Sequence, residues 1–222
     1  MSNILEEIKQ EVEQEQWLNL WKKYQNHVYG AVAAILLITA GVLWWQNHQS
    51  SKIALQSTEY TQALMLSESD PENALKIFEH IPAKGETIYA LLSRFWVASM
   101  LLQRGDTKGA RELYEIIYKN STSLFSPSKE KVLGQLAHIH GLYIDIDTAD
   151  PELIIRQATP YAKQDSPWQM LANELLGLAY LKKGDKEKAR SYLGKIVEDP
   201  KSAAALKVRA QAVINYLNTT QK

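Results

Sequence analysis

The longest apolar stretch of the chain reads VYGAVAAILLITAGVLWW, from Val28 to Trp45, and none of its 18 residues is charged. As a helix rising about 1.5 Å per residue, it spans roughly 27 Å, close to the hydrocarbon thickness of a bilayer. Two tryptophans close the stretch, and Tyr24 and Tyr29 lie near its start, as in an aromatic belt. The pattern predicts a transmembrane anchor at residues 25–47.

Two other interpretations of this stretch are less favourable. A buried core helix of the same length usually carries a few charges along a wetted edge. A cleaved signal peptide usually has a short leading segment and a shorter apolar region. Here 27 residues precede the stretch, and the QNHQSSK segment that follows it lacks a small-x-small cleavage pattern. An uncleaved anchor is therefore favoured.

The first 24 residues have apolar positions at spacings of three and four, which suits an amphipathic helix. Five glutamates make its first half acidic, so anionic lipid would repel that half. Residues 1–24 are predicted to be a cytoplasmic amphipathic helix. They either bind a partner of their own or simply extend the membrane helix.

The lysines around the anchor indicate its orientation. Lys22 and Lys23 lie just before it, and only Lys52 follows within about 15 residues. Because cytoplasmic flanks are enriched in Lys and Arg, the N-terminus is expected inside and the larger domain outside.

From Ile53 onward the apolar pattern is helical, and four segments repeat one order: a helix, a tight turn and a second helix. In such a turn Gly accepts a positive φ after the first helix, Asp caps the second helix, and Pro suits its first turn. The turns are Gly105-Asp106, Gly184-Asp185, Asp70-Pro71 and Asp150-Pro151.

The spacing of the second helices identifies the kind of repeat. Ala74, Ala110, Ile154 and Ala189 occupy the same slot, at separations of 36, 44 and 35 residues, near the tetratricopeptide period of about 34. The sequence thus predicts an all-α fold, with the transmembrane helix followed by an α-solenoid of tetratricopeptide-like hairpins over residues 48–222. A non-repetitive helical bundle is the alternative. The residues expected to pack the repeats are Ala74, Ala98, Ala110, Gly177, Tyr180 and Ala189, and a helix from 203 to 217 is expected to cap the last hairpin.

Composition adds mainly exclusions. Lys plus Arg and Asp plus Glu both number 25, so no basic surface suggests nucleic acid, and the absence of cysteine excludes thiolate chemistry. His138 and His140 are two apart and would point to different sides of a helix. Asp145, Asp147 and Asp150 lack the Gly and distal Glu of a calcium loop, so a solvated turn is favoured. No catalytic motif is present, and neither an enzyme nor a cofactor is expected.

The chain as a whole resembles a bacterial family, the ancillary subunits of the SecYEG translocon. The resemblance is carried by WKKY, by WWQNHQ at the end of the anchor, by YTQAL, by ETIYALLSRFWVASMLLQRGD and by ELLGLAYLKKGDKEKARSYL. It implies a single-pass inner-membrane protein with a periplasmic tetratricopeptide-like domain. It also implies association with SecYEG and with a membrane-anchored periplasmic chaperone of the peptidyl-prolyl isomerase type, so that emerging polypeptides pass to periplasmic chaperones.

In tetratricopeptide folds the first helix of each pair lines the concave face. On that basis a partner-binding groove is expected, with Arg94 and Glu174 nearby; its residues would be Leu92, Phe95, Leu102, Leu171, Leu178 and Leu181. The alternative is that neighbouring helices bury these side chains. Two further functions stay open: a periplasmic scaffold for envelope assembly or division, and an accessory or sensor protein whose N-terminal helix signals inward.

Overall fold

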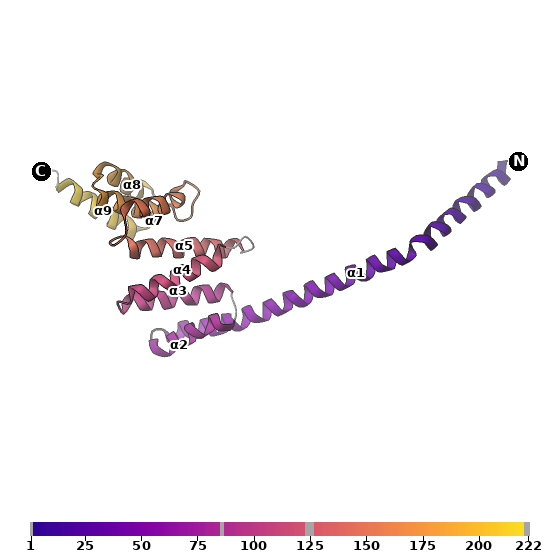
Figure 1. Ribbon diagram of the computed structural model, residues 1–222, viewed down its shortest axis with the longest axis horizontal. Helices are drawn as coiled ribbons and strands as arrows, with labels where there is room; N and C mark the ends of the chain where they lie inside the picture. The colour runs from indigo at the N-terminus through magenta and orange to yellow at the C-terminus, as the bar shows by residue number, and fades with distance from the viewer. Residues whose placement is uncertain (1, 85–86, 123–126, 220–222) are drawn as a thin grey trace. The chain divides into compact units, whose positions relative to one another are not determined.

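A computed structural model describes residues 2–84, 87–122 and 127–219, while the side chains of 2–24, 26–33 and 84 lie outside the described part. The described residues are helical or in turns (Figure 1). The helices are α1 (Ser2–Leu66), α2 (Pro71–His80), η1 (Ile81–Lys84), α3 (Ile88–Gln103), α4 (Thr107–Ser121), α5 (Ser128–Asp145), α6 (Pro151–Ala158), η2 (Thr159–Ala162), α7 (Gln169–Lys183), α8 (Lys186–Glu198) and α9 (Ala204–Thr219). The expectation of an all-α fold is confirmed for this part of the chain.

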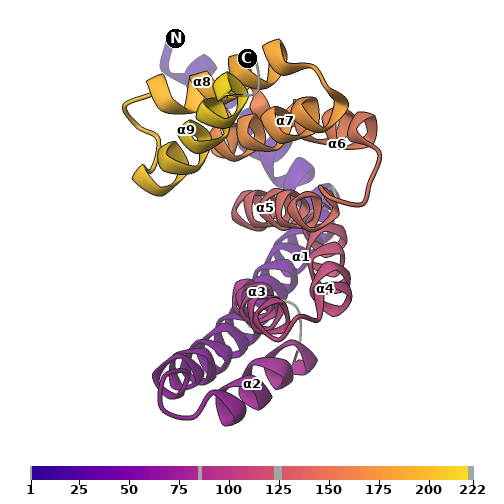
Figure 2. The same cartoon turned by 90° about the vertical axis from the view of Figure 1, so that its left-hand side faces the viewer.

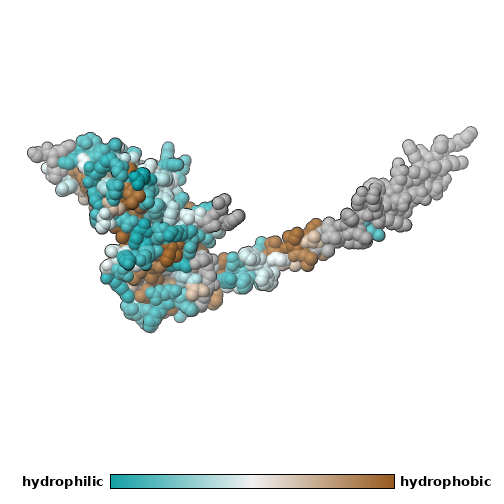
Figure 3. All heavy atoms as spheres, in the orientation of Figure 1, coloured by the Kyte–Doolittle hydropathy of each residue, from teal (hydrophilic) through white to brown (hydrophobic). Residues whose placement is uncertain are grey.

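The chain divides into two compact units, Met1–Leu55 and Gln56–Lys222. The first unit contains α1 up to Leu55, and the end of α1 belongs to the second unit. The helix passes unbroken through the expected boundaries near residues 24 and 47. Its described side chains include a run of large exposed apolar residues, seen as a brown band on α1 in Figure 3.

Among the residues with described side chains, no helix is both long and apolar enough to cross a membrane. The predicted anchor at 25–47 lies partly outside these residues, because side chains 26–33 are not described. Lys22 and Lys23, the predicted topology determinants, have side chains that lie wholly outside them.

The second unit is a series of helical hairpins stacked in chain order from α2 to α9 (Figures 1 and 2). Each junction is filled by apolar side chains from neighbouring helices. Phe78 of α2, for example, is fully buried together with Ala63 from the end of α1 and Ala74 of α2, and its ring stacks on Trp96 of α3 at 4.3 Å. Packing between successive helices, and not a single central core, therefore supports this unit.

The turns between paired helices form as their sequences predict. Gly105 and Gly184 have φ values of 82° and 90°, a region that suits glycine. The carboxylates of Asp106 and Asp185 accept hydrogen bonds from backbone N–H groups of α4 and α8, at 2.9 and 3.1 Å. These side chains satisfy donors that have no partner within the helix, so each turn fixes where the second helix begins.

The Asp-Pro turns work in the same way. Asp70 and Asp150 cap α2 and α6 through bonds from backbone N–H groups, and a proline occupies the first helical turn of each. Pro160 coincides with the change from α6 to the short 3-10 helix η2, because proline cannot continue the hydrogen-bonding pattern of an α-helix. Residues 123–126 (SLFS), which follow α4, lie outside the described residues.

Candidate functional site

The six predicted groove residues lie on two helices, Leu92, Phe95 and Leu102 on α3 and Leu171, Leu178 and Leu181 on α7. All six are half-buried. Between α3 and α7 in the chain comes α5, which packs against both of them. The six residues therefore form two patches, one on α3 and one on α7, and α5 connects the two helices. The sequence did not predict this role of α5.

Part of this set serves internal packing. The ring of Phe95 lies 5.6 Å from that of Tyr114 and 6.1 Å from the imidazole of His140. Leu102 packs against the same cluster, and Leu171 packs against the buried residues of α7 and α8. The described buried clusters do not include Leu92, Leu178 or Leu181, and the binding role of these three stays a prediction.

The predicted repeat-packing residues lie at helix junctions. Four alanines have no exposed surface: Ala74, Ala98, Ala110 and Ala189. Gly177 of α7 is buried against α8, where an added Cβ would come within 2.6 Å of Leu193 Cγ. Tyr180 stacks on Tyr192 of α8 at 5.5 Å, and Lys188 Nζ lies 5.0 Å from the centre of the Tyr180 ring.

Glu174, expected beside the groove, is instead buried in a polar network. Arg209 of α9 donates two hydrogen bonds to its carboxylate, at 2.8 and 2.9 Å. The Tyr143 hydroxyl of α5 donates a third at 2.5 Å and also contacts the carbonyl of Leu171. Burial raises the pKa of the Tyr143 hydroxyl, and the adjacent carboxylate raises it further. The network ties α5, α7 and α9 together.

The aspartate-rich turn after α5 is held by a lysine. Lys182 Nζ donates to the carbonyls of Ile146, Asp147 and Ala149 at 3.2, 2.6 and 3.2 Å. A cation from the protein itself thus occupies the oxygen cage of this turn. Within the described part of the chain, no cluster of three acidic or histidine side chains is arranged to hold a metal ion.

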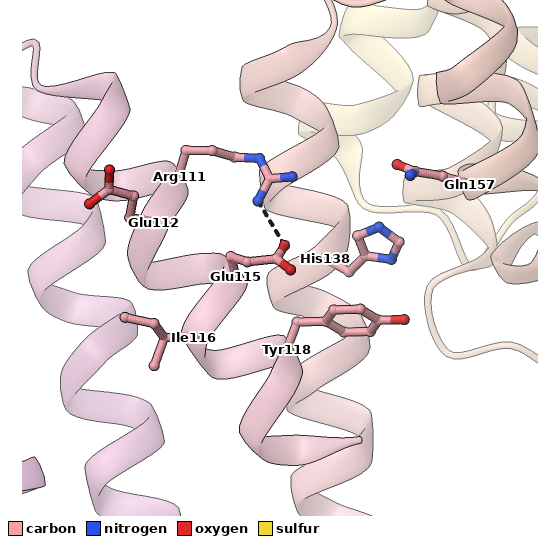
Figure 4. A pocket seen from close by; sticks show the side chains of 7 residues that line it. All are labelled: Arg111, Glu112, Glu115, Ile116, Tyr118, His138 and Gln157. Carbon is pink, nitrogen blue, oxygen red and sulfur yellow. Dashed lines mark hydrogen bonds and ion pairs between the residues drawn. The ribbon is translucent and has the colours of Figure 1, made fainter. Parts of the chain in front are cut away.

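A pocket of about 850 Å³ lies between α4, α5 and α6. Its lining consists of Arg111, Glu112, Glu115, Ile116, Tyr118, His138 and Gln157. Figure 4 shows the Arg111 and Glu115 side chains on the same side as His138 and Tyr118, with Gln157 across from them. None of these residues was singled out as a groove position, because the pocket involves the second helices of two hairpins.

Ion pairs organise one side of this pocket. Arg111 donates to Asp145 at 2.9 Å and to Glu115 at 3.0 Å, and Lys119 lies 3.4 Å from Glu115. Burial lowers the pKa of Arg111, but the bonds to the two carboxylates outweigh burial and raise the pKa overall. For Glu115 burial acts in the opposite direction and raises the pKa, but the bonds to Arg111 and Lys119 outweigh burial and lower the pKa overall. Both groups are therefore charged at neutral pH.

Aromatic rings form the floor. The His138 ring stacks on Tyr118 at 4.4 Å, and its Nδ1 lies 2.7 Å from the hydroxyl of Tyr161. Burial lowers the pKa of His138, although Gln157 and the nearby carboxylates oppose this shift. A neutral imidazole at pH 7 follows, so the floor of the pocket is uncharged.

The chain matches a family model described as a tetratricopeptide repeat-like domain over residues 18–213. The chain belongs to this family. It is also 25% identical, over 186 residues, to a protein from Aggregatibacter actinomycetemcomitans named ancillary SecYEG translocon subunit. The match covers 81% of this chain and 86% of that relative. No solved structure matches the chain. The tetratricopeptide-like hairpins and the resemblance to ancillary translocon subunits are thus both confirmed.

His138 and His140 should make the free energy of unfolding depend on pH. Burial lowers the folded-state pKa of both His138 and His140. The unfolded chain then binds more protons below about pH 6.5, so the free energy of unfolding should fall as pH drops from 7.5 toward 6. The loss is at most about 1.4 kcal/mol per pH unit for each histidine. Urea unfolding of the full chain in detergent at several pH values measures it.

The matched variant is His140→Phe, which keeps an aromatic ring against Phe95 and Tyr114 but cannot bind a proton. It should make the pH dependence between 7.5 and 6 shallower. A slope identical to that of the wild type would contradict a contribution from His140.

Proposed function

We propose that this protein is a non-enzymatic, membrane-anchored interaction module that associates with the SecYEG translocon. The observation that carries the proposal is the tetratricopeptide-like match, joined in one chain to an apolar segment and to similarity with a protein of that name. Domains of this family present stacked helices as surfaces for binding other proteins.

The apolar segment of α1 supports the anchor. Ile35, Leu36, Leu37 and Ile38 are consecutive and exposed, with Leu37 75% exposed. Since successive helical residues are turned by about 100°, these four cover every side of the helix. A one-sided protein interface would leave some of them in water, whereas a bilayer would surround them all.

The proposed topology follows from the same segment. Residues 25–47 span the inner membrane, 1–24 lie in the cytoplasm, and 48–222 form a periplasmic domain. The excess of lysine before the span, at Lys22 and Lys23, supports this direction. In this arrangement the domain stands where translocated polypeptides emerge. It would cooperate there with a membrane-anchored chaperone of the peptidyl-prolyl isomerase type and pass polypeptides to periplasmic chaperones.

Crosslinking in intact membranes tests this function. The full-length protein should stay in the membrane fraction after alkaline extraction, and its crosslinked partners should include SecYEG subunits. If the α7 patch binds a partner, Leu178→Gln with Leu181→Gln should reduce the crosslinked fraction severalfold. Leu153→Gln, an exposed leucine on α6, is the control and should leave it unchanged.

Two results would count against the proposal. Release of the protein by alkaline extraction would exclude the anchor. Crosslinks that contain no translocon subunit, from a protein that stays in the membrane, would exclude the association with SecYEG.

A further inference from the structure

The last helix of the domain, α9, has an outer face without charge. It ends the stack of hairpins (Figures 1 and 2), and its inner face packs on α8 through Leu206 and Ala210. Two of the described residues of α9 are charged: Lys207 is half-buried, and Arg209 is bonded to Glu174. The outward side, which we name the α9 stripe, consists of five exposed uncharged residues: Ala205, Val208, Ala212, Tyr216 and Thr219.

The α9 stripe is narrow and largely apolar. At about 100° per residue, its five members fall within roughly 80° of the helix circumference. Val208 is 70% exposed and Tyr216 is 58% exposed. The polar side chains along one edge, those of Gln211 and Asn215, bond each other at 2.9 Å. A helix that caps a solenoid against water would carry a polar outer face, so the stripe is suited to contact another protein surface.

The order of residue sizes along the stripe is the same in both directions. Ala212 is its middle, the larger Val208 and Tyr216 lie four residues away on either side, and the small Ala205 and Thr219 lie seven residues away. Two antiparallel copies of α9 that cross at Ala212 would place each Val208 against the Tyr216 of the other copy. The alanine at the crossing lets the two helices approach closely.

The absence of charge also favours a second copy as the occupant. In a twofold contact the residue on the axis meets its own copy, so a charge there would be repelled. A twofold contact covers the exposed ends of both solenoids at once and leaves no surface for further copies. The helix is about 24 Å long, and one helix pair buries less than the ~800 Å² per partner of a standard interface. The pair is therefore weak in solution, and anchoring in one membrane strengthens it by raising the effective concentration.

We propose that the α9 stripe is the contact surface of a twofold homodimer, in which the α9 helices of two copies cross antiparallel at Ala212. Val208 of each copy packs on Tyr216 of the other. The strength of the dimer rests on the proposed membrane anchor, whereas its geometry does not. The stripe shares no residue with the predicted groove.

The absence of cysteine from the chain allows a direct test. Ala212→Cys in the full-length protein, in native membranes, places one thiol of each copy at the twofold axis, and a short bismaleimide should join the two copies. Ala205→Cys is the matched variant on the same stripe. Its two thiols would lie about 21 Å apart along the antiparallel pair, so it should crosslink at least fivefold less. Co-expressed with a differently tagged Thr219→Cys chain, it should form mixed dimers, because these two positions face each other.

Charge changes test which side chains meet. Val208→Glu, added to Ala212→Cys, should lower the crosslinked fraction severalfold, because it places a carboxylate against the Tyr216 ring of the other copy. Adding Tyr216→Lys should restore most of the loss, since the new cation then faces the new carboxylate across the dimer. The two positions are about 12 Å apart within one helix, too far to pair there. Both side chains are exposed, so the domain should stay folded.

Three results would overturn the dimer. Equal crosslinking of Ala212→Cys and of Glu187→Cys, an exposed position on α8, would show that the copies meet only by random collision. Equal crosslinking of Ala212→Cys and Ala205→Cys would exclude the antiparallel pair. Capture of a different protein by Ala212→Cys, without joined copies, would identify a foreign occupant.

Failure of this proposal can be told apart from failure of the proposed function. Crosslinking of the protein to SecYEG does not depend on the α9 stripe and should be unaffected by Val208→Glu. Loss of joined copies with SecYEG crosslinks intact rejects the dimer alone, whereas wild-type protein without SecYEG crosslinks rejects the translocon association.

Discussion

Replacing Gly177 with valine is expected to lower the free energy of unfolding by about 3 kcal/mol, at the upper end of overpacking costs. An added Cβ at this position would lie 2.6 Å from Leu193 Cγ and 2.8 Å from Leu193 Cδ2. Leu193 has no exposed surface, so it cannot move aside into solvent. Valine adds two further methyl groups at the same junction between α7 and α8. Urea unfolding of the full-length protein in detergent measures the change.

A second helical glycine provides the control. Gly194 lies within α8, and a Cβ there would have only Glu198 Oε1 nearby, at 3.9 Å. Gly194→Ala should therefore stabilise the protein by up to about 1 kcal/mol, through helix propensity alone. Leu193→Ala should destabilise the wild type yet relieve the strain of Gly177→Val, so the double variant should cost less than the sum of the two. Equal effects at the two glycines would contradict the role of Gly177.

The features that the sequence predicts well are local ones. Gly184 and Asp185 define a helix end and the next helix start within two residues, and the φ of 90° and the capping bond to α8 follow directly. Repetition of such turns at a near-constant period is enough to predict stacked hairpins. The hairpin of α5 and α6 also has local signals: Pro151 lies in the first turn of α6, and Pro160 lies where α6 gives way to η2.

The boundaries along α1 are a different case. The change from acidic to apolar near residue 24, and back to polar near residue 47, marks a change of expected surroundings and not of backbone conformation. Neither place contains proline or a Gly-Asp turn, so nothing ends the helix there. The polarity of the side chains therefore changes along α1, while its backbone stays one continuous helix.

The interactions that the sequence does not predict join residues far apart in the chain. Arg209 and Glu174 are 35 residues apart, and Lys182 reaches carbonyls 33 to 36 residues earlier. The sequence does contain one signal for the pair of Arg209 and Glu174. Glu174 is the charged residue within ANELLGLAYL, a stretch otherwise suited to burial. A buried carboxylate requires a partner, but the sequence does not say which of the basic residues supplies it.

Replacing Arg209 with methionine is expected to lower the free energy of unfolding by about 2–3 kcal/mol, because it leaves the Glu174 carboxylate buried without its cation. The Glu174 side chain is 6% exposed and that of Arg209 57%, so solvent screens part of the attraction and the estimate stays below that for a fully buried pair. Since Arg209 is on α9, hydrogen exchange in α9 should rise more than in α3 or α4.

The accompanying variants identify the unpaired charge as the cause. Glu174→Gln combined with Arg209→Met removes the charge and keeps a hydrogen-bond acceptor for Tyr143, so the double variant should be more stable than Arg209→Met alone. If the single and double variants were equally unstable, lost packing of the arginine stem would explain the effect instead.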